Sequence, residues 1–164
     1  MPTIPRRWPF EVESEREGAV RSADEAVQML QRAQGTLDNA RSKMNVNQSL
    51  ALVLVTDTER HLSDALSRTE RVRRFLSVAR GKPINGRWPQ AVSRQREEAE
   101  EALERAISTL DEAERGLQPL RDKITKNPAL SEAIIADLSL LLSRALNRVE
   151  RSVRLLTEAG IGRD

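Results

Sequence analysis

The second half of the chain repeats the first, and this duplication constrains the fold more than any other feature. When residues 7–81 are aligned without a gap to residues 87–161, 26 of the 75 positions are identical. Both copies open with Arg-Trp-Pro, and both keep the block Ala-Leu-x-Arg-x-Glu-Arg. A repeat of this kind requires a fold made of two similar halves that pack on each other.

Within each copy, apolar residues follow a 4–3 heptad spacing in two successive stretches. The first stretch covers residues 12–44 and its copy residues 92–124, and nine of ten stripe positions are apolar in each. The second stretch covers residues 55–76 and its copy residues 135–156. This spacing is typical of α-helices rather than strands. An aromatic content of 2% also disfavours a β-sandwich or barrel.

Helix boundaries are marked by capping and breaking residues. Asn47 and Asn127 stand before the second stretch of each copy, where we expect them to act as N-caps. Residues 80–86 separate the copies with Pro and Gly. Pro119 lies inside the third predicted helix, and because proline removes a backbone donor we expect a kink there.

Short loops make successive helices antiparallel. The sequence therefore predicts an all-α fold, an antiparallel up-down-up-down four-helix bundle built from two tandem helical hairpins with pseudo-twofold symmetry. We expect a single domain over residues 1–164, with repeat units at residues 7–80 and 87–160.

The composition removes most catalytic chemistry. The chain has no Cys, no Tyr and one His, which excludes disulfides, thiolate metal sites and cysteine nucleophiles. Glutamates are dense between residues 97 and 104, but no Glu-x-x-His motif accompanies them, so we interpret them as a solvated face. His61 has no second histidine or triad partner. We therefore expect no enzymatic activity, no cofactor and no metal site.

The net charge is +2, with 14 basic and 11 acidic residues in residues 1–82 and 13 and 14 in residues 83–164, so neither half is strongly charged. The longest apolar run, residues 50–55, is far shorter than the roughly 20 residues of a membrane span. The first ten residues contain no apolar signal-peptide core. These features predict a cytoplasmic protein without a membrane segment.

Basic residues gather where the second and fourth predicted helices end, beside the acidic starts of the first and third. Charge complementarity between neighbouring helices accounts for most of them, including the i,i+4 pairs Glu70–Arg74 and Glu150–Arg154. Contact with nucleic acid is the alternative. The candidate contacts in these helices are Arg71, Arg74, Arg151 and Arg154.

All four aromatic side chains are expected at this same end of the bundle: Trp8, Phe10, Phe75 and Trp88. One interpretation is a structural plug, in which each tryptophan covers the open end of the core. The other is a binding platform in which Arg7, Trp8, Arg87 and Trp88 contact a partner or stack on bases. Arg16 and Arg96 would then either extend outward or lie over the rings.

The second and fourth predicted helices carry more apolar residues than one stripe requires. Such a surplus indicates either a self-association surface or tight wrapping by neighbouring helices. The candidate residues for self-association are Leu52, Leu54, Val55, Leu140 and Leu141. We therefore expect a non-enzymatic adaptor or scaffold that binds a protein partner or itself as a homo-oligomer. A nucleic-acid-binding accessory protein that uses the Arg/Trp end is the alternative.

Overall fold

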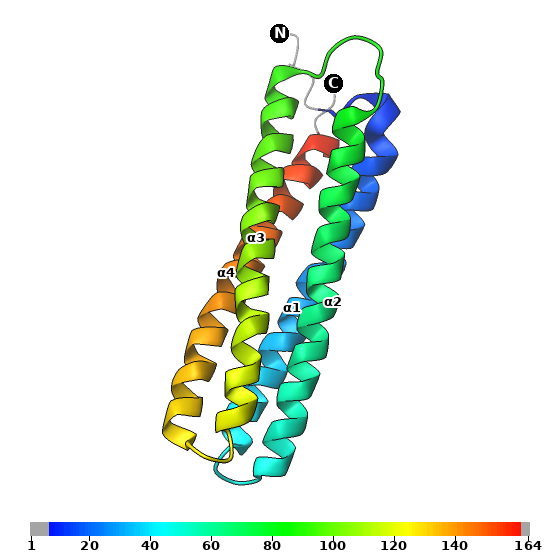
Figure 1. Cartoon of the computed structure of the whole chain (residues 1–164). Helices are drawn as coiled ribbons and strands as arrows, with labels where there is room; N and C mark the ends of the chain where they lie inside the picture. Colours follow the sequence, from blue (N-terminus) through cyan, green and yellow to red (C-terminus); the bar gives the residue numbers. More distant parts are fainter. Residues whose placement is uncertain (1–6, 162–164) are drawn as a thin grey trace.

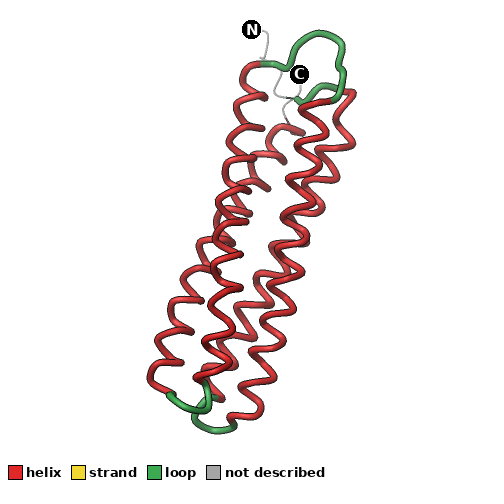
Figure 2. Tube along the Cα trace, viewed as in Figure 1, coloured by secondary structure: helices red, strands yellow, loops and turns green. Residues whose placement is uncertain are grey.

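A computed structural model describes residues 7–161, and side chains up to residue 159. This part of the chain is helical throughout, apart from the connections, and contains no strand (Figure 2). A short 3₁₀ turn, η1, precedes the four long helices and covers Phe10–Val12. The helices are α1 (Glu13–Lys43), α2 (Gln48–Gly81), α3 (Gln90–Lys123) and α4 (Pro128–Ile161). The predicted all-α four-helix bundle is confirmed.

The helices form a ring in chain order (Figure 1). Helix α1 packs against α2 and α4, and α3 packs against the same two helices. Consequently α1 and α3 lie at opposite corners of the bundle, and so do α2 and α4. The closest packing is within the two hairpins, α1–α2 and α3–α4.

The heptad stripes form the core. Leu30 and Leu37 of α1 and Leu110 of α3 have no exposed surface, and Leu117 of α3 is 2% exposed. Many other stripe positions are alanines with no exposed surface, such as Ala33. Small residues at these positions allow helix backbones to approach closely, which fits the tight packing within each hairpin.

Both predicted N-caps are confirmed. The Asn47 side-chain oxygen accepts a hydrogen bond from the Leu50 amide at 3.1 Å, and Asn127 accepts one from the Leu130 amide at the same distance. The backbone hydrogen bonds of the two hairpin loops match as well, although the loop sequences differ at residues 44–46 and 124–126.

Pro119 lies inside α3, but it does not interrupt the helix, since α3 continues to Lys123.

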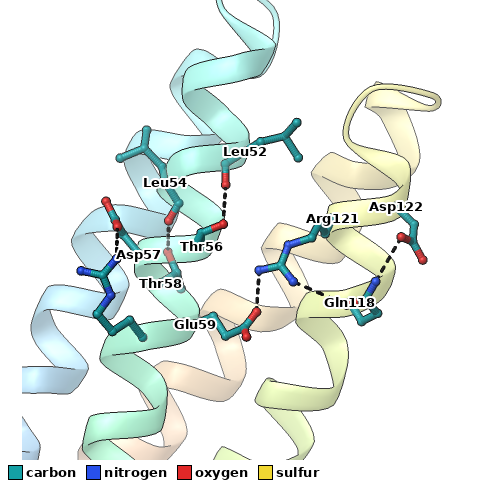
Figure 3. A network of polar contacts seen from close by, with 10 residues as sticks. Leu52, Leu54, Thr56, Asp57, Thr58, Glu59, Gln118, Arg121 and Asp122 are labelled. Carbon is teal, nitrogen blue, oxygen red and sulfur yellow. Dashed lines mark hydrogen bonds and ion pairs between the residues drawn. The ribbon is translucent and has the colours of Figure 1, made fainter.

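Polar side chains connect the two hairpins along both of their shared boundaries. Arg41 of α1 pairs with Glu132 of α4 at 3.3 Å. Its counterpart in the second repeat, Arg121 of α3, pairs with Glu59 of α2 (Figure 3). The arginine that both copies retain thus reaches the other hairpin in each case, but it meets a carboxylate at a different position.

Candidate functional site

The two Arg-Trp-Pro segments meet at one end of the bundle. The ring centroids of Trp8 and Trp88 are 5.0 Å apart, and the rings are inclined at 68° in an edge-to-face arrangement. Trp8 is 4% exposed, whereas Trp88 is half-buried. Both rings pack against the hydrophobic core. The contact therefore closes this end of the core and joins the first residues of the two repeats.

Two equivalent arginines support this end in different ways. The Arg96 guanidinium carbon lies 4.6 Å from the centroid of the Trp88 ring, and its Nε donates to Glu100 at 3.0 Å. Arg16 instead donates from Nη1 to the carbonyl oxygen of Leu156 near the end of α4, at 3.0 Å. A cation is favourable at both places, over an aromatic face and beside C-terminal helix carbonyls.

Two carboxylates, one in η1 and one at the start of α1, hold the connection between α2 and α3. Lys82 pairs with Glu15 at 3.0 Å, and the backbone amide of Asn85 donates to the Glu11 carboxylate. The Asn85 amide lowers the pKa of Glu11, and the hydrogen bond from Lys82 lowers the pKa of Glu15. Gly86 has a φ of 84°, a conformation that favours glycine.

This geometry matches the plug more closely than the stacking platform. Trp8 has almost no free surface, and Arg96 covers one face of Trp88 while Trp8 lies at an edge-to-face angle to it. Arg7 and Arg87 are exposed beside them. Among the described residues, Trp8 Nε1 is buried without a hydrogen-bond partner. Trp8 therefore offers no open face for base stacking, and Arg96 already occupies one face of Trp88.

The four candidate arginines of α2 and α4 are all exposed. Arg151 lies 3.8 Å from Glu98, whereas Arg71, Arg74 and Arg154 form no ion pair with another residue of the 7–161 segment. The expected pairs Glu70–Arg74 and Glu150–Arg154 are absent from the ion pairs of that segment. Charge complementarity accounts for fewer of these arginines than the sequence predicts.

An open groove lies between α1 and α2 at the tryptophan end, and we call it the Phe75 groove. Its volume is about 370 Å³. Sequence reasoning did not identify it as a site, because Phe75 and Val78 are not on the core stripe. The alignment of the repeats contains one signal, since Gly18 stands where the second repeat has Glu98. In the structure, the Phe75 ring lies against Gly18. The groove is lined by Glu15, Arg71, Arg74, Phe75 and Val78.

Phe10 lies in η1, near the same end, and its side chain is 92% exposed. The sequence placed it among the aromatic residues of this end but did not single it out as a contact. Phenylalanine side chains are usually buried, so this exposure is unusual. The chain has two phenylalanines.

The predicted self-association residues divide into three groups. Val55 has no exposed surface, because it is a core residue of α2, and it is therefore excluded from any contact surface. Leu52, Leu54 and Leu141 are half-buried against the core, so wrapping by neighbouring helices accounts for much of their apolar surface. Leu140 is 52% exposed and remains a candidate.

The candidates on α2 and α4 cannot form one patch, since these helices lie at opposite corners of the bundle. Val53, which the sequence interpretation did not select, is 55% exposed on α2. The exposed apolar residues of α2 and α4 therefore lie on two separate sides of the bundle rather than on the single surface that the sequence suggested.

Residues 7–161 contain no group of three or more Asp, Glu or His side chains placed to hold a metal. His61 is half-buried on α2. None of the helices in the described segment combines the length and the apolar character that crossing a membrane demands. No protein-family model, curated protein or solved structure matches this chain significantly.

Proposed function

We propose that this bundle is a non-enzymatic interaction protein that associates with a second copy of itself through the outer face of α4. The observation that carries the proposal is a line of exposed apolar residues that ends at Leu140, which is 52% exposed. Their spacing of four, three and four residues places them along one side of the helix. The line consists of Ala129, Ala133, Ala136 and Leu140.

The equivalent face of α2 is more polar. Its residues are Ser49, Val53, Thr56 and Arg60, so one apolar residue remains in that line. Duplication supplies two similar helices, and α4 alone has an apolar outer face over its first three turns. Three small residues beside one leucine let a second helix approach closely and cover Leu140. Full burial of a leucine is worth about 1.5–3 kcal/mol, and roughly half of this is still to be gained at Leu140, which is 52% exposed.

The test replaces Leu140 by the residue that the first repeat has at this position, arginine. Wild-type protein is expected to form a concentration-dependent oligomer in multi-angle light scattering, and Leu140→Arg is expected to be monomeric with unchanged helix content in circular dichroism. Val53→Ala, which transfers the second repeat's residue to α2, is the matched control and should leave the mass unchanged. A monomeric wild type, or an oligomer that Leu140→Arg does not weaken, would exclude the proposal.

The second candidate function is nucleic-acid binding at the Arg/Trp end. It is supported by Arg7, Arg71, Arg74 and Arg87, which are exposed at one end of the bundle. The buried position of Trp8 excludes stacking on that ring, so this candidate depends mainly on charge attraction. Binding would then fall steeply with salt and show little sequence preference. Titration of single-stranded DNA at two salt concentrations tests it, and absence of binding at low salt excludes it.

A further inference from the structure

The Phe75 groove differs from the matching region of the second hairpin in a systematic way. In the second hairpin, Arg151 faces Glu98 at 3.8 Å. The equivalent of Arg151 is Arg71, but the equivalent of Glu98 is Gly18. Within the described residues Arg71 has no carboxylate partner, because the first repeat lacks the acid that the second repeat places there.

The missing carboxylate is replaced by an aromatic ring. A Cβ atom on Gly18 would come within 2.7 Å of Phe75 Cε1 and Cζ, so the ring occupies the space that a side chain at position 18 would need. The second repeat has Leu155 in place of Phe75. Val78, which is 55% exposed, replaces a second acid, Glu158. At positions 18 and 78 the first hairpin therefore lacks the acids that the second hairpin carries.

The acid that does line the groove is already engaged. Glu15 pairs with Lys82 at 3.0 Å, and this interaction lowers the pKa of Glu15. Arg71 and Arg74 are therefore not neutralised by the groove itself. The result is two exposed guanidinium groups beside a half-buried ring and an exposed valine, in an open volume of about 370 Å³.

We propose that the Phe75 groove binds a short acidic segment of a partner protein, in which an apolar side chain is flanked by carboxylates. Carboxylates form charge-assisted and often bidentate hydrogen bonds with arginine, and Phe75 with Val78 supplies the surface for the apolar side chain. This inference builds on the proposed function as an interaction protein, but it uses a different helix pair from the α4 face. A nucleic acid fits less well, because Phe75 lies against α1 rather than standing free to stack on a base.

The second hairpin provides a built-in control. A groove of about 250 Å³ lies there between α3 and α4, and none of its lining residues is aromatic. Two of its three arginines pair with carboxylates of the same groove, and the third, Arg148, donates to Thr109 Oγ1 at 2.6 Å. The lining residues of this groove are Glu98, Glu101, Ala102, Arg105, Arg148 and Arg151. A peptide that recognises unpaired arginines next to an apolar surface should distinguish the two grooves.

The experiment is calorimetric titration with a blocked pentapeptide, Asp-Glu-Leu-Asp-Glu. Wild-type protein is expected to bind it with a Kd below about 1 mM. Arg71→Gln/Arg74→Gln should weaken binding at least about tenfold, and Phe75→Leu, the residue of the second repeat, about threefold or more. Arg151→Gln should have no effect. A peptide with Gly in place of Leu should also bind more weakly.

Three results would overturn the proposal: no binding at millimolar peptide, equal weakening by Arg151→Gln, or tighter binding of a single-stranded DNA of the same charge. The titration is repeated on Leu140→Arg to separate the two proposals. If that variant binds the peptide as wild type does, peptide binding in the groove does not depend on self-association, whatever the light-scattering result. Circular dichroism of every variant establishes that its helix content is preserved.

Discussion

The two hairpins differ at an equivalent pair of positions where side chains of their two helices meet. In the first hairpin, the hydroxyls of Thr36 and Thr58 are 2.7 Å apart and share a hydrogen bond between α1 and α2. In the second hairpin, the equivalent residues are Gly116 and Leu138, and a Cβ on Gly116 would lie 2.7 Å from Leu138 Cδ2. Two medium-sized polar residues have been exchanged for one very small and one large apolar residue.

The same kind of exchange occurs nearer the tryptophan end. Gly18 with Phe75 in the first hairpin corresponds to Glu98 with Leu155 in the second. In both cases a glycine on one helix is matched by a large side chain on the other. We infer from this comparison that paired substitutions preserve the helix arrangement of the hairpins. Where such a pair lies at the surface, the two hairpins present different side chains to the solvent.

The largest effect is expected where the two hairpins are the same. Leu30 and Leu110 are equivalent and fully buried, so Leu30→Ala and Leu110→Ala should each lower the free energy of unfolding by about 2–5 kcal/mol. Because each hairpin buries its apolar stripe against the other, both variants should unfold in one transition. Urea unfolding followed by circular dichroism measures this. Two separate transitions would show that the hairpins are independently stable and break the comparison.

A smaller loss is expected when a residue of the first hairpin is transferred alone to the second. Gly116→Thr places a Cβ against Leu138, which is 3% exposed and has little room to move. Overpacking of this kind costs about 1–3 kcal/mol, which corresponds to a thermal midpoint lower by roughly 2–12 °C for a chain of this size.

The matched rescue is Gly116→Thr/Leu138→Thr, which rebuilds the threonine pair of the first hairpin. We expect it to recover part of the lost stability, measured by the same thermal unfolding. If Leu138→Thr adds its full cost to that of Gly116→Thr instead, the two positions are not coupled and the paired-substitution interpretation is wrong.

The equivalent transfer into the Phe75 groove should cost less. Gly18→Glu forces the Phe75 ring aside, but that ring is half-exposed and can turn outward, so we expect a loss of about 1 kcal/mol. Adding Phe75→Leu should restore stability, since the second repeat has this pair. Thermal unfolding of the single and double variants is the measurement. A Gly18→Glu protein as stable as wild type would show that the close contact is easily relieved.

The smallest effect concerns pH. Glu11 and Glu15 have pKa values lowered from 4.5, so their contribution to stability is present above that value and disappears as the pH falls through the lowered values. Glu11→Ala/Glu15→Gln transfers the residues of the second repeat, Ala91 and Gln95. Its thermal midpoint should lie slightly below that of wild type at pH about 6 and closer to it at pH about 3, because protonation removes the contribution as the pH falls below 4.5. An equal difference at both pH values would mean that the carboxylate charges are not responsible.

The fold followed from features that act locally or repeat along the chain. Heptad spacing identifies the buried side of each helix, and Asn47 and Asn127 place the starts of α2 and α4 through side-chain hydrogen bonds to nearby amides. Neither depends on which helices become neighbours. Because the halves are duplicated, the helix boundaries and buried positions of one hairpin also predict those of the other.

The contact surfaces were harder to predict, because they depend on the angle at which each helix faces its neighbours. A shift of one position around α2 separates buried Val55 from half-buried Leu54, and exposed Val53 is one position further. The role of Phe75 could be recognised only with its partner Gly18, which is 57 positions earlier in the sequence. The alignment of the repeats shows that both positions changed, but not that they touch.

The contact between Trp8 and Trp88 has an optical consequence. These are the two tryptophans of a chain without tyrosine, and their ring centroids are 5.0 Å apart. Almost all intrinsic fluorescence of the protein therefore originates at one tip of a long rod. The emission reports on the tip that adjoins the Phe75 groove, while fraying of the distant hairpin loops leaves it unchanged.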